Sequence, residues 1–214
     1  MRNEHVRPEP GHAKHATPNP QNLSVETTRL SLTPLSAPQT SSQNQSQSVP
    51  SVRPGDIDAF MAVFADKNSA RMTHAIPHPL SRTEAESLLA RMSSTPFSHW
   101  AIRLEDEQLI GIISLTRSTC GTAGDIHSFG PNLSVFIAPA HQGQGYAIEA
   151  TDGLLRWVKK RRLHRIIHAA HFADNEASAR ALITADFLYT GRKTLETSLA
   201  RDGEHLALHM IRIL

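Results

Sequence analysis

The ten residues HQGQGYAIEA, at positions 141–150, constrain the fold of this chain more than any other stretch. Gly143 and Gly145 stand between a strand-like pattern and an apolar pattern of helical spacing. A glycine turn there leaves the first main-chain N–H groups of the helix open, and the helix dipole adds positive charge. The stretch therefore predicts that an anion such as a phosphate approaches the main chain. It lacks the Lys-Ser/Thr pair of a Walker loop and the full Rossmann glycine spacing, and a plain structural turn is the alternative.

Strands and helices alternate irregularly around this turn, which predicts an α/β (α+β) fold. Apolar patterns predict strands at 23–35, 100–104, 109–115, 133–138, 165–172 and 206–214. Helical spacing predicts helices from Asp56, which we expect as a cap, from Ser81 with Glu84 in a capping box, after Gly145, and after Asn175. Residues 133–172 are long enough for one parallel crossover, so we expect the rest of the sheet to be antiparallel.

Composition divides the chain into three kinds of segment. Residues 1–22 are rich in Pro and His and are expected to form a disordered tail. Residues 23–214 are expected to form a single domain. A Ser, Gln and Pro tract at 36–53 is predicted to be a low-complexity insertion in that domain, either a plain flexible loop or a partner-binding one.

The balanced charge, the single cysteine and the absence of a long apolar run point to a soluble cytoplasmic protein. The formal net charge is +2, which does not favour nucleic acid as the main partner, and no apolar run approaches the roughly 18 residues of a membrane helix. The single cysteine, Cys120, fits a reducing compartment. The basic run at 159–165 is interpreted as the end of a helix, with an RNA surface as the alternative.

Three blocks in order resemble the GNAT N-acetyltransferase superfamily. Gln142, Gly145 and Ala147 fit the pattern Gln/Arg-x-x-Gly-x-Gly/Ala, and Asn175 and Ser178 fit Asn-x-x-Ser in HFADNEASARALITADF. VETTRLSLTPL, followed later by IPHPLSRTEAESLL, is similar to the branch that includes ribosomal-protein N-terminal acetyltransferases. The resemblance implies a mostly antiparallel sheet of about six to seven strands, splayed between the fourth and fifth, with about four flanking helices.

The resemblance also implies acetyl-CoA as the acetyl donor and assigns residues to it. Main-chain groups at Phe136, Ile137 and Ala138 would pair with the pantetheine arm, and Ser178 would lie near the sulfur as the one candidate catalytic residue. The pyrophosphate would be cradled by Gln142, Gly143, Gln144, Gly145, Tyr146 and Ala147. Asn175 would bind the pantetheine amide, with a simple helix N-cap as its alternative, and Ser178 has the alternative of a solvated first-turn serine.

The implied reaction is direct attack of an amine, from a protein N-terminus or a small molecule, on the thioester. The chain departs from the family at Leu182, where many relatives have a tyrosine acid, and at Asn132, where relatives often have a carboxylate. The general base is therefore unassigned; His127, Asp125 and Glu84 lie in segments that could face the site, and each has the alternative of a solvated loop or helix residue. A catalytically idle domain that binds CoA or a partner is the alternative function.

Other residue clusters do not support a different chemistry. His168 and His171 would point to opposite faces of a strand, so we expect no metal site. A Cys120–His127 nucleophile would lie in a loop without supporting residues. The basic run at 159–165 could also reach the 3′-phosphate of CoA. The chain is expected to be a monomer or a homodimer.

Overall fold

The computed structural model describes residues 23–35, 55–95, 98–117 and 130–214. The predicted tail at 1–22, the insertion at 36–53 and the candidates Cys120, Asp125 and His127 lie outside these residues. Within the described residues, no helix combines the length and apolar character needed to cross a membrane.

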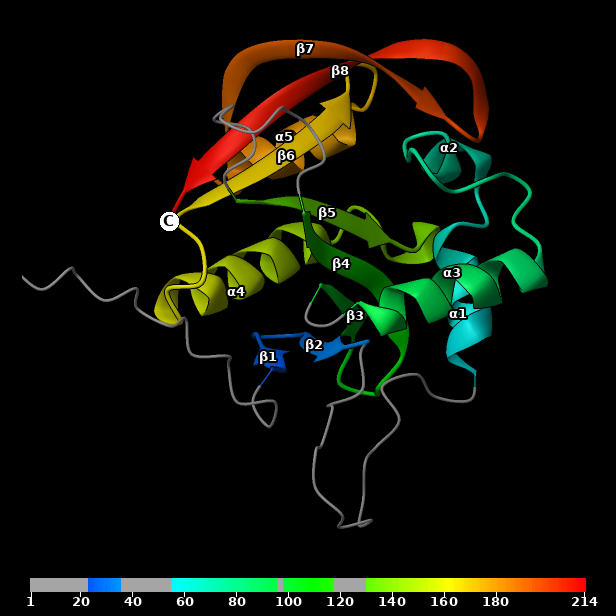
Figure 1. The fold of residues 1–214 in the computed structure, drawn as a ribbon. Helices are drawn as coiled ribbons and strands as arrows, with labels where there is room; N and C mark the ends of the chain where they lie inside the picture. Colours follow the sequence, from blue (N-terminus) through cyan, green and yellow to red (C-terminus); the bar gives the residue numbers. More distant parts are fainter. Residues whose placement is uncertain (1–22, 36–54, 96–97, 118–129) are drawn as a thin grey trace, which may run out of the picture.

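One open sheet organises the described part of the chain (Figure 1). The elements follow in the order β1 (Val25–Glu26), β2 (Ser31–Pro34), α1 (Asp56–Val63), α2 (Lys67–Ala70), α3 (Arg82–Ser94), β3 (His99–Arg103), β4 (Leu109–Arg117), β5 (Pro131–Ile137), the 3₁₀ turn η3 (Pro139–His141), α4 (Tyr146–Lys160), β6 (Ile166–Phe172), α5 (Glu176–Thr184), β7 (Leu188–Ser198) and β8 (Arg201–Ile213). The strands lie side by side as β1-β2-β3-β4-β5-β6-β8-β7. Only the β5–β6 pair is parallel, because α4 carries the chain back across the sheet between these two strands.

The sheet buries an apolar core on each of its two faces. On one face α4 and α5 pack on the strands through side chains such as Ala150, Leu154 and Leu182. On the other face Phe60 and Phe64 of the α1 region and Leu88 of α3 pack against β4. A sheet covered by helices on both faces confirms the predicted mixed fold. Among the described residues the sheet has eight strands, slightly more than expected.

The first predicted strand is broken into a hairpin of two short strands. Thr27 makes the break, because its hydroxyl accepts from the N–H of Leu30 at 3.0 Å and its own N–H donates to the Leu30 carbonyl at 2.9 Å. Val25 and Leu32 face each other across this hairpin. A threonine turn therefore adds a strand that apolar alternation alone did not predict.

The first two of the predicted helix starts have different outcomes. Ser81 and Glu84 form the expected capping box at the start of α3. Asp56 does not cap α1: Gly55 holds the N-cap position, and the Asp56 carboxylate is buried in an ion pair with Arg103 at 2.7 Å. The prediction of an Asp56 cap is wrong because a buried guanidinium from β3 competes for the carboxylate. The short helix α2, capped by Asp66, is an addition to the predicted set.

Candidate functional site

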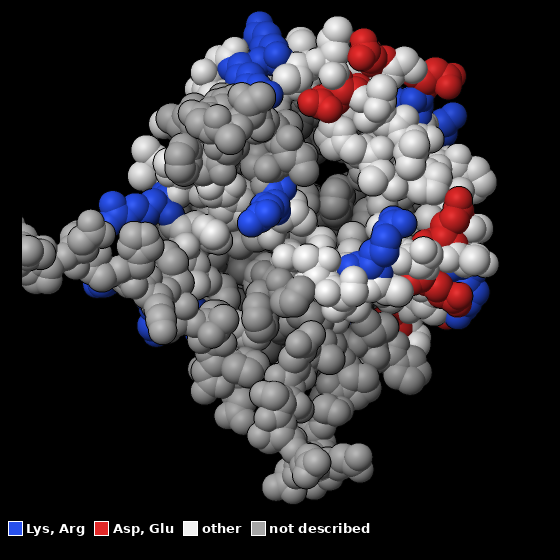
Figure 2. Space-filling view, viewed as in Figure 1, with Lys and Arg blue, Asp and Glu red and all other residues white. Residues whose placement is uncertain are grey.

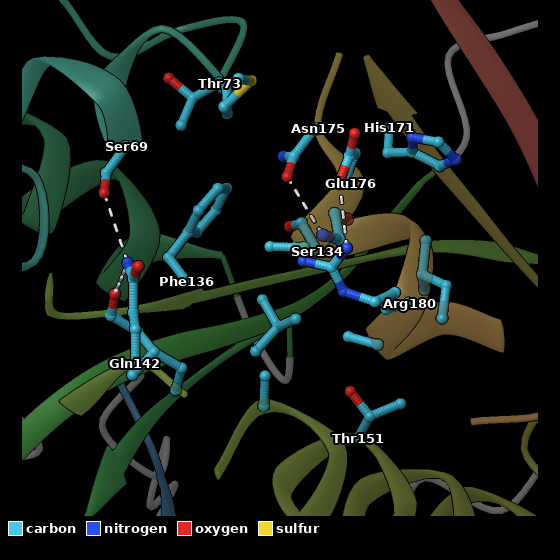
Figure 3. A pocket seen from close by; sticks show the side chains of 18 of the residues that line it. Ser69, Thr73, Ser134, Phe136, Gln142, Thr151, His171, Asn175, Glu176 and Arg180 are labelled. Carbon is cyan, nitrogen blue, oxygen red and sulfur yellow. Dashed lines mark hydrogen bonds and ion pairs between the residues drawn. The ribbon is translucent and has the colours of Figure 1, made fainter. Parts of the chain in front are cut away.

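The parallel strands β5 and β6 separate soon after they begin to pair. Their Cα partners are Asn132 with His168 and Leu133 with Ala169, and the pairing ends there. These are the fourth and fifth of the predicted strands, so the expected splay is confirmed. The opening belongs to a cavity of about 830 Å³ (Figure 3). Its walls come from α1 and α2, β5, the glycine turn with the first turns of α4, and the end of β6 with α5.

The edge of β5 presents main-chain groups to this opening. The Ala138 N–H donates to the Ile110 carbonyl of β4 at 2.8 Å, and hydrogen-bonding direction alternates along a strand. Phe136 therefore also faces β4 with its main chain, whereas Val135 and Ile137 face the opening. Of the predicted trio, Phe136 and Ile137 line the cavity, while Ala138 is not among the lining residues.

The glycine turn leaves the start of α4 open. Gly143 and Gly145 have φ angles of 75° and 82°, and Gly145 is the N-cap without any side-chain hydrogen bond. The first helical bond runs from Glu149 N–H to the Gly145 carbonyl at 3.0 Å. The N–H groups of residues 146–148 therefore have no partner inside the helix. A Cβ at Gly143 would meet nothing within 4 Å, so these glycines serve the left-handed backbone and an unobstructed approach.

The predicted turn residues lie around this open helix end. Gln142, Gly143, Gly145, Tyr146 and Ala147 all line the cavity, and Gln144 does not. The Gln142 amide donates to the Ile137 carbonyl at 2.9 Å and to the Ser69 hydroxyl at 3.3 Å (Figure 3). The Gln142 side chain therefore ties the glycine turn to β5 and to α2.

An ion pair from the distant N-terminal hairpin holds the same turn. Arg29 contacts Glu149 of α4 at 2.7 Å and donates to the Gln144 carbonyl at 3.1 Å, and Thr27 donates to Glu149 at 2.7 Å. Partial burial acts to raise the pKa of Glu149, but the hydrogen bonds from Thr27 and Arg29 and the charge of Arg29 hold it below its usual value. Sequence reasoning missed this trio because Thr27 and Glu149 are 122 positions apart and no local pattern joins them.

Asn175 and Ser178 lie at the start of α5, on another wall of the cavity. The Asn175 side-chain oxygen accepts from the Ser178 N–H at 3.1 Å, which is the helix-cap geometry. The cap uses only the amide oxygen, so the amide NH₂ can still donate to a ligand. Leu182, at the place of the family's tyrosine, also lines the cavity and is buried.

The carboxylates of the cavity wall are engaged by neighbours. Asp66 caps α2 by accepting from Ser69 N–H at 2.9 Å. Asp174 accepts from two arginines; although partial burial acts to raise its pKa, hydrogen bonds from Arg201 and Arg71 and the Arg201 charge hold it below its usual value. Glu176 pairs with Arg180 at 3.1 Å. A carboxylate whose pKa is lowered, such as Asp174, is a poor base near neutral pH.

Glu84, the candidate base on α3, is exposed in the capping box and is not among the residues that line the cavity. Its hydrogen bonds to Ser81 hold its pKa below the usual value. The structure therefore does not bring Glu84 into the candidate site.

Three histidines line the cavity: His74, His141 and His171. Side-chain hydrogen bonds orient His74 and His171. His74 Nδ1 lies 3.2 Å from the Thr197 carbonyl, and because a carbonyl only accepts, Nδ1 carries the hydrogen and Nε2 can accept a proton. His171 Nδ1 lies 2.8 Å from the Phe172 carbonyl and its Nε2 lies 2.9 Å from the Tyr189 hydroxyl. Among the described residues, no group of three His, Cys, Asp or Glu side chains could hold a metal ion.

The face seen in Figure 2 shows lysine and arginine side chains of the described residues in separate groups, without one continuous basic stripe. Aspartate and glutamate side chains lie toward the right and upper right of this view, where basic side chains lie among them. The basic residues Lys159 and Lys160 lie in the last turn of α4, at its C-terminal end, where cations complement the helix dipole. Their helix end is opposite to the open N-terminus that borders the cavity.

Comparison with known proteins identifies the family to which this fold belongs. A model described as an acetyltransferase (GNAT) domain matches residues 50–187. A GNAT-family acetyltransferase from Bacillus anthracis has a TM-score of 0.66 and 14% identity over 89% of this chain and 98% of that chain. Spermidine N-acetyltransferase from Vibrio cholerae, solved with CoA and spermine, has a TM-score of 0.60 and 18% identity over 76% of this chain and 92% of that chain.

Ribosomal-protein-S5-alanine acetyltransferase from Vibrio fischeri has a TM-score of 0.62 and 15% identity over 89% of this chain and 96% of that chain. The branch suggested by the sequence is therefore one of several that share the fold. No curated protein sequence is significantly similar to this one.

Proposed function

The chain belongs to the GNAT acetyltransferase family, and from that premise we propose that it is an acetyl-CoA-dependent N-acetyltransferase. One observation carries the proposal: a single cavity runs from the open start of α4 to the opening between β5 and β6. An open helix start suits a pyrophosphate, and a free strand edge suits the amides of a pantetheine arm. The Vibrio cholerae relative was solved with CoA, which agrees with this donor.

The proposed donor site uses main-chain groups first. N–H groups of Tyr146, Ala147 and residue 148 bind the pyrophosphate, and Val135 and Ile137 pair with the pantetheine amides. The Asn175 NH₂ group binds a pantetheine carbonyl. Because glycine keeps Cβ atoms away from the turn, the phosphates can reach the helix end without displacing a side chain.

The proposed reaction is one direct transfer. The neutral amine forms a bond to the thioester carbonyl carbon, the carbon–sulfur bond breaks, and the CoA sulfur leaves as a thiolate. N–H groups on the free edge of β5 stabilise the oxyanion, and the Ser178 hydroxyl donates to the leaving sulfur. His74 Nε2 takes the proton from the amine, directly or through one water, because its Nδ1–H is held by Thr197.

Two assays on the full chain test this function. Calorimetry should show CoA binding, and thiol release from acetyl-CoA should depend on an added amine drawn from protein N-terminal peptides, amino acids and polyamines. Absence of CoA binding would overturn the donor site. Binding without thiol release for any amine would favour the idle CoA-binding domain, for which Leu182 in place of the tyrosine is the supporting observation.

His74→Gln tests the base. We expect kcat to fall about 100-fold or more, since a general base contributes roughly 10²–10⁴, with the Kd for CoA unchanged. His205→Gln is the matched control, because His205 packs against the same Phe172 ring as His74 but hydrogen-bonds Asp202. Equal activity of the two variants would exclude His74 as the base.

A further inference from the structure

Two arginines from distant segments share one carboxylate at the cavity wall. Arg71 Nη2 lies 2.6 Å and Arg201 Nη1 lies 2.8 Å from the same oxygen of Asp174. Asp174 lines the cavity, and its neighbours there include Thr73 and Phe172. Two guanidinium groups against one carboxylate leave an excess of positive charge at this place.

Arg201 has an unused edge. Its side chain is only 10% exposed, and its Nε and Nη2 are buried without a hydrogen-bond partner among the described residues. These two nitrogens form the side-on edge of the guanidinium, which binds a carboxylate or phosphate with two parallel hydrogen bonds. Arg71 Nε is unpartnered in the same way. Buried donors of a charged group are normally satisfied, so this arrangement points to an oxyanion that completes it.

The arginine pair adjoins the cavity through Asp174, which lines it, whereas Arg71 and Arg201 are not themselves among the lining residues. The Arg201 guanidinium lies 4.2 Å above the ring of Phe172, whose other neighbours include His74 at 5.0 Å. Figure 3 shows Thr73 apart from Gln142 of the glycine turn, with Ser69 between them. The donor pyrophosphate and the arginine pair are therefore separate, and the arginine pair lies next to the proposed base.

We propose that Arg201 and Arg71 bind a carboxylate or phosphate group of the acetyl acceptor, so that the substrates are amines that also carry an oxyanion. This inference rests on the proposed N-acetyltransferase function. The same wall disfavours polyamines, because Asp66 is used as a helix cap and Asp174 is shared by two arginines. Arg71, whose side chain is 38% exposed and whose surface ion pair with Asp174 is weak, moves to admit the oxyanion and then binds it through its own unpartnered Nε.

Matched acceptors test the subsite. Amino acids are compared with their amides, aminoalkyl phosphates with the corresponding amino alcohols, and spermidine is included as a cation. We expect the wild-type protein to show kcat/KM at least about tenfold higher for one anionic class than for its neutral partner. The class that gains distinguishes a carboxylate from a phosphate.

Variants assign the selectivity to the arginine fork. Arg201→Met should erase the preference for the anionic acceptor by raising its KM, and Arg201→Lys should keep only part of it, because a lysine has no fork. The Kd for CoA should not change in either variant. Arg82→Met is the control, since Arg82 pairs with Asp58 and Glu86 on the surface outside the cavity wall. Arg201→Lys also serves if the methionine variant does not fold.

The outcomes test the oxyanion subsite and the acetyltransferase activity separately. Thiol release that is equal for anionic and neutral amines, or unchanged in both Arg201 variants, overturns the oxyanion subsite and leaves the acetyltransferase proposal standing. If no amine releases thiol, the acetyltransferase proposal fails, and calorimetric titration of the same amines into the CoA-bound protein tests the subsite directly. Binding of the anionic member alone, lost in Arg201→Met, supports the subsite, and no binding overturns it.

Discussion

At the residue scale, Glu149 places a negative charge in the first turn of the helix that we propose binds a pyrophosphate. Arg29 compensates for this charge, since it pairs with Glu149 at 2.7 Å and stacks over Tyr146 at 4.5 Å. A Cβ at Gly145 would lie 3.6 Å from Arg29 Nη2, so the guanidinium also borders the turn itself. Glu149 and Arg29 together fix the turn without leaving a repulsive carboxylate in front of the phosphates.

Ala147→Asp tests the anion site with little change to the helix. An aspartate in the first turn favours helix formation, but its charge repels a pyrophosphate. We expect the Kd for CoA to rise at least about tenfold. Thr83→Asp, at the same position of α3 and outside the cavity wall, is the control. Equal CoA affinity of wild type and Ala147→Asp would argue against phosphate binding at this helix end.

Glu149→Gln tests the ion pair through pH. The folded protein holds the pKa of Glu149 below its ordinary value of 4.5, so the carboxylate stabilises the fold fully above that pH, and this stabilisation is lost as the pH falls through the folded pKa. The Tm difference between wild type and Glu149→Gln should therefore be largest near pH 7 and shrink below about pH 4. Glu86→Gln, at an exposed helical pair, should change Tm little at either pH.

At the scale of elements, α5 ends in a Schellman motif that a non-glycine residue completes. Phe187 N–H donates to the Leu182 carbonyl at 3.0 Å and Asp186 N–H to the Ile183 carbonyl at 3.1 Å, with Asp186 at a φ of 57°. Phe187 and Leu182 are both buried in the core that α4 and α5 share. The motif thus fixes where the chain leaves the cavity wall and enters β7.

Asp186→Gly should stabilise the protein by about 0.5–1 kcal/mol, because the left-handed backbone penalises a Cβ. The lost ion pair with Arg212, at 3.5 Å and with Asp186 82% exposed, offsets little of this gain. Urea denaturation measures the change. Asp186→Ala is the control: it keeps the Cβ and should not stabilise. Equal gains from both variants would show that backbone conformation is not the cause.

At the scale of the whole molecule, a buried ion pair joins the helical layer of α1 to the sheet. Arg103 of β3 binds both carboxylate oxygens of Asp56, at 3.0 and 2.7 Å, and also donates to Thr33 of β2 and to the Glu107 carbonyl. Four hydrogen bonds satisfy this guanidinium, in contrast to Arg201. The comparison is what makes the unpartnered edge of Arg201 informative.

Arg103→Met should destabilise the fold by about 3–5 kcal/mol, because it leaves the Asp56 carboxylate buried without its partner. The double variant Arg103→Met/Asp56→Leu should recover much of that loss. Arg82→Met removes a surface ion pair between α3 and Asp58, which lies on α1 as Asp56 does. This change should cost about 0–1 kcal/mol. Denaturant unfolding of the four proteins measures the differences, and a loss in Arg103→Met no larger than that in Arg82→Met would contradict the account.

Local signals explain which parts could be predicted. The Ser81–Glu84 box, the glycine turn before Tyr146 and the alternating residues of β5 depend on neighbours within a few positions, and the structure confirms each as local structure. Asp56 was misjudged because its partner, Arg103, is 47 positions away. The contact of Arg29 with the glycine turn could not be predicted for the same reason, because Arg29 and Gln144 are 115 positions apart.

The family resemblance, the mixed sheet and the turn that we propose binds the donor can all be inferred from the sequence alone. Short motifs and periodic apolar patterns along the chain are enough to indicate them. Which side chains meet around Asp174 depends on the tertiary structure. Arg71, Asp174 and Arg201 come from three separate segments, with Arg71 and Asp174 103 positions apart. Their shared oxygen and the unused guanidinium edge exist only once the end of β6 lies beside α2 and the start of β8. The acceptor recognition that we propose is therefore a property of the assembled sheet.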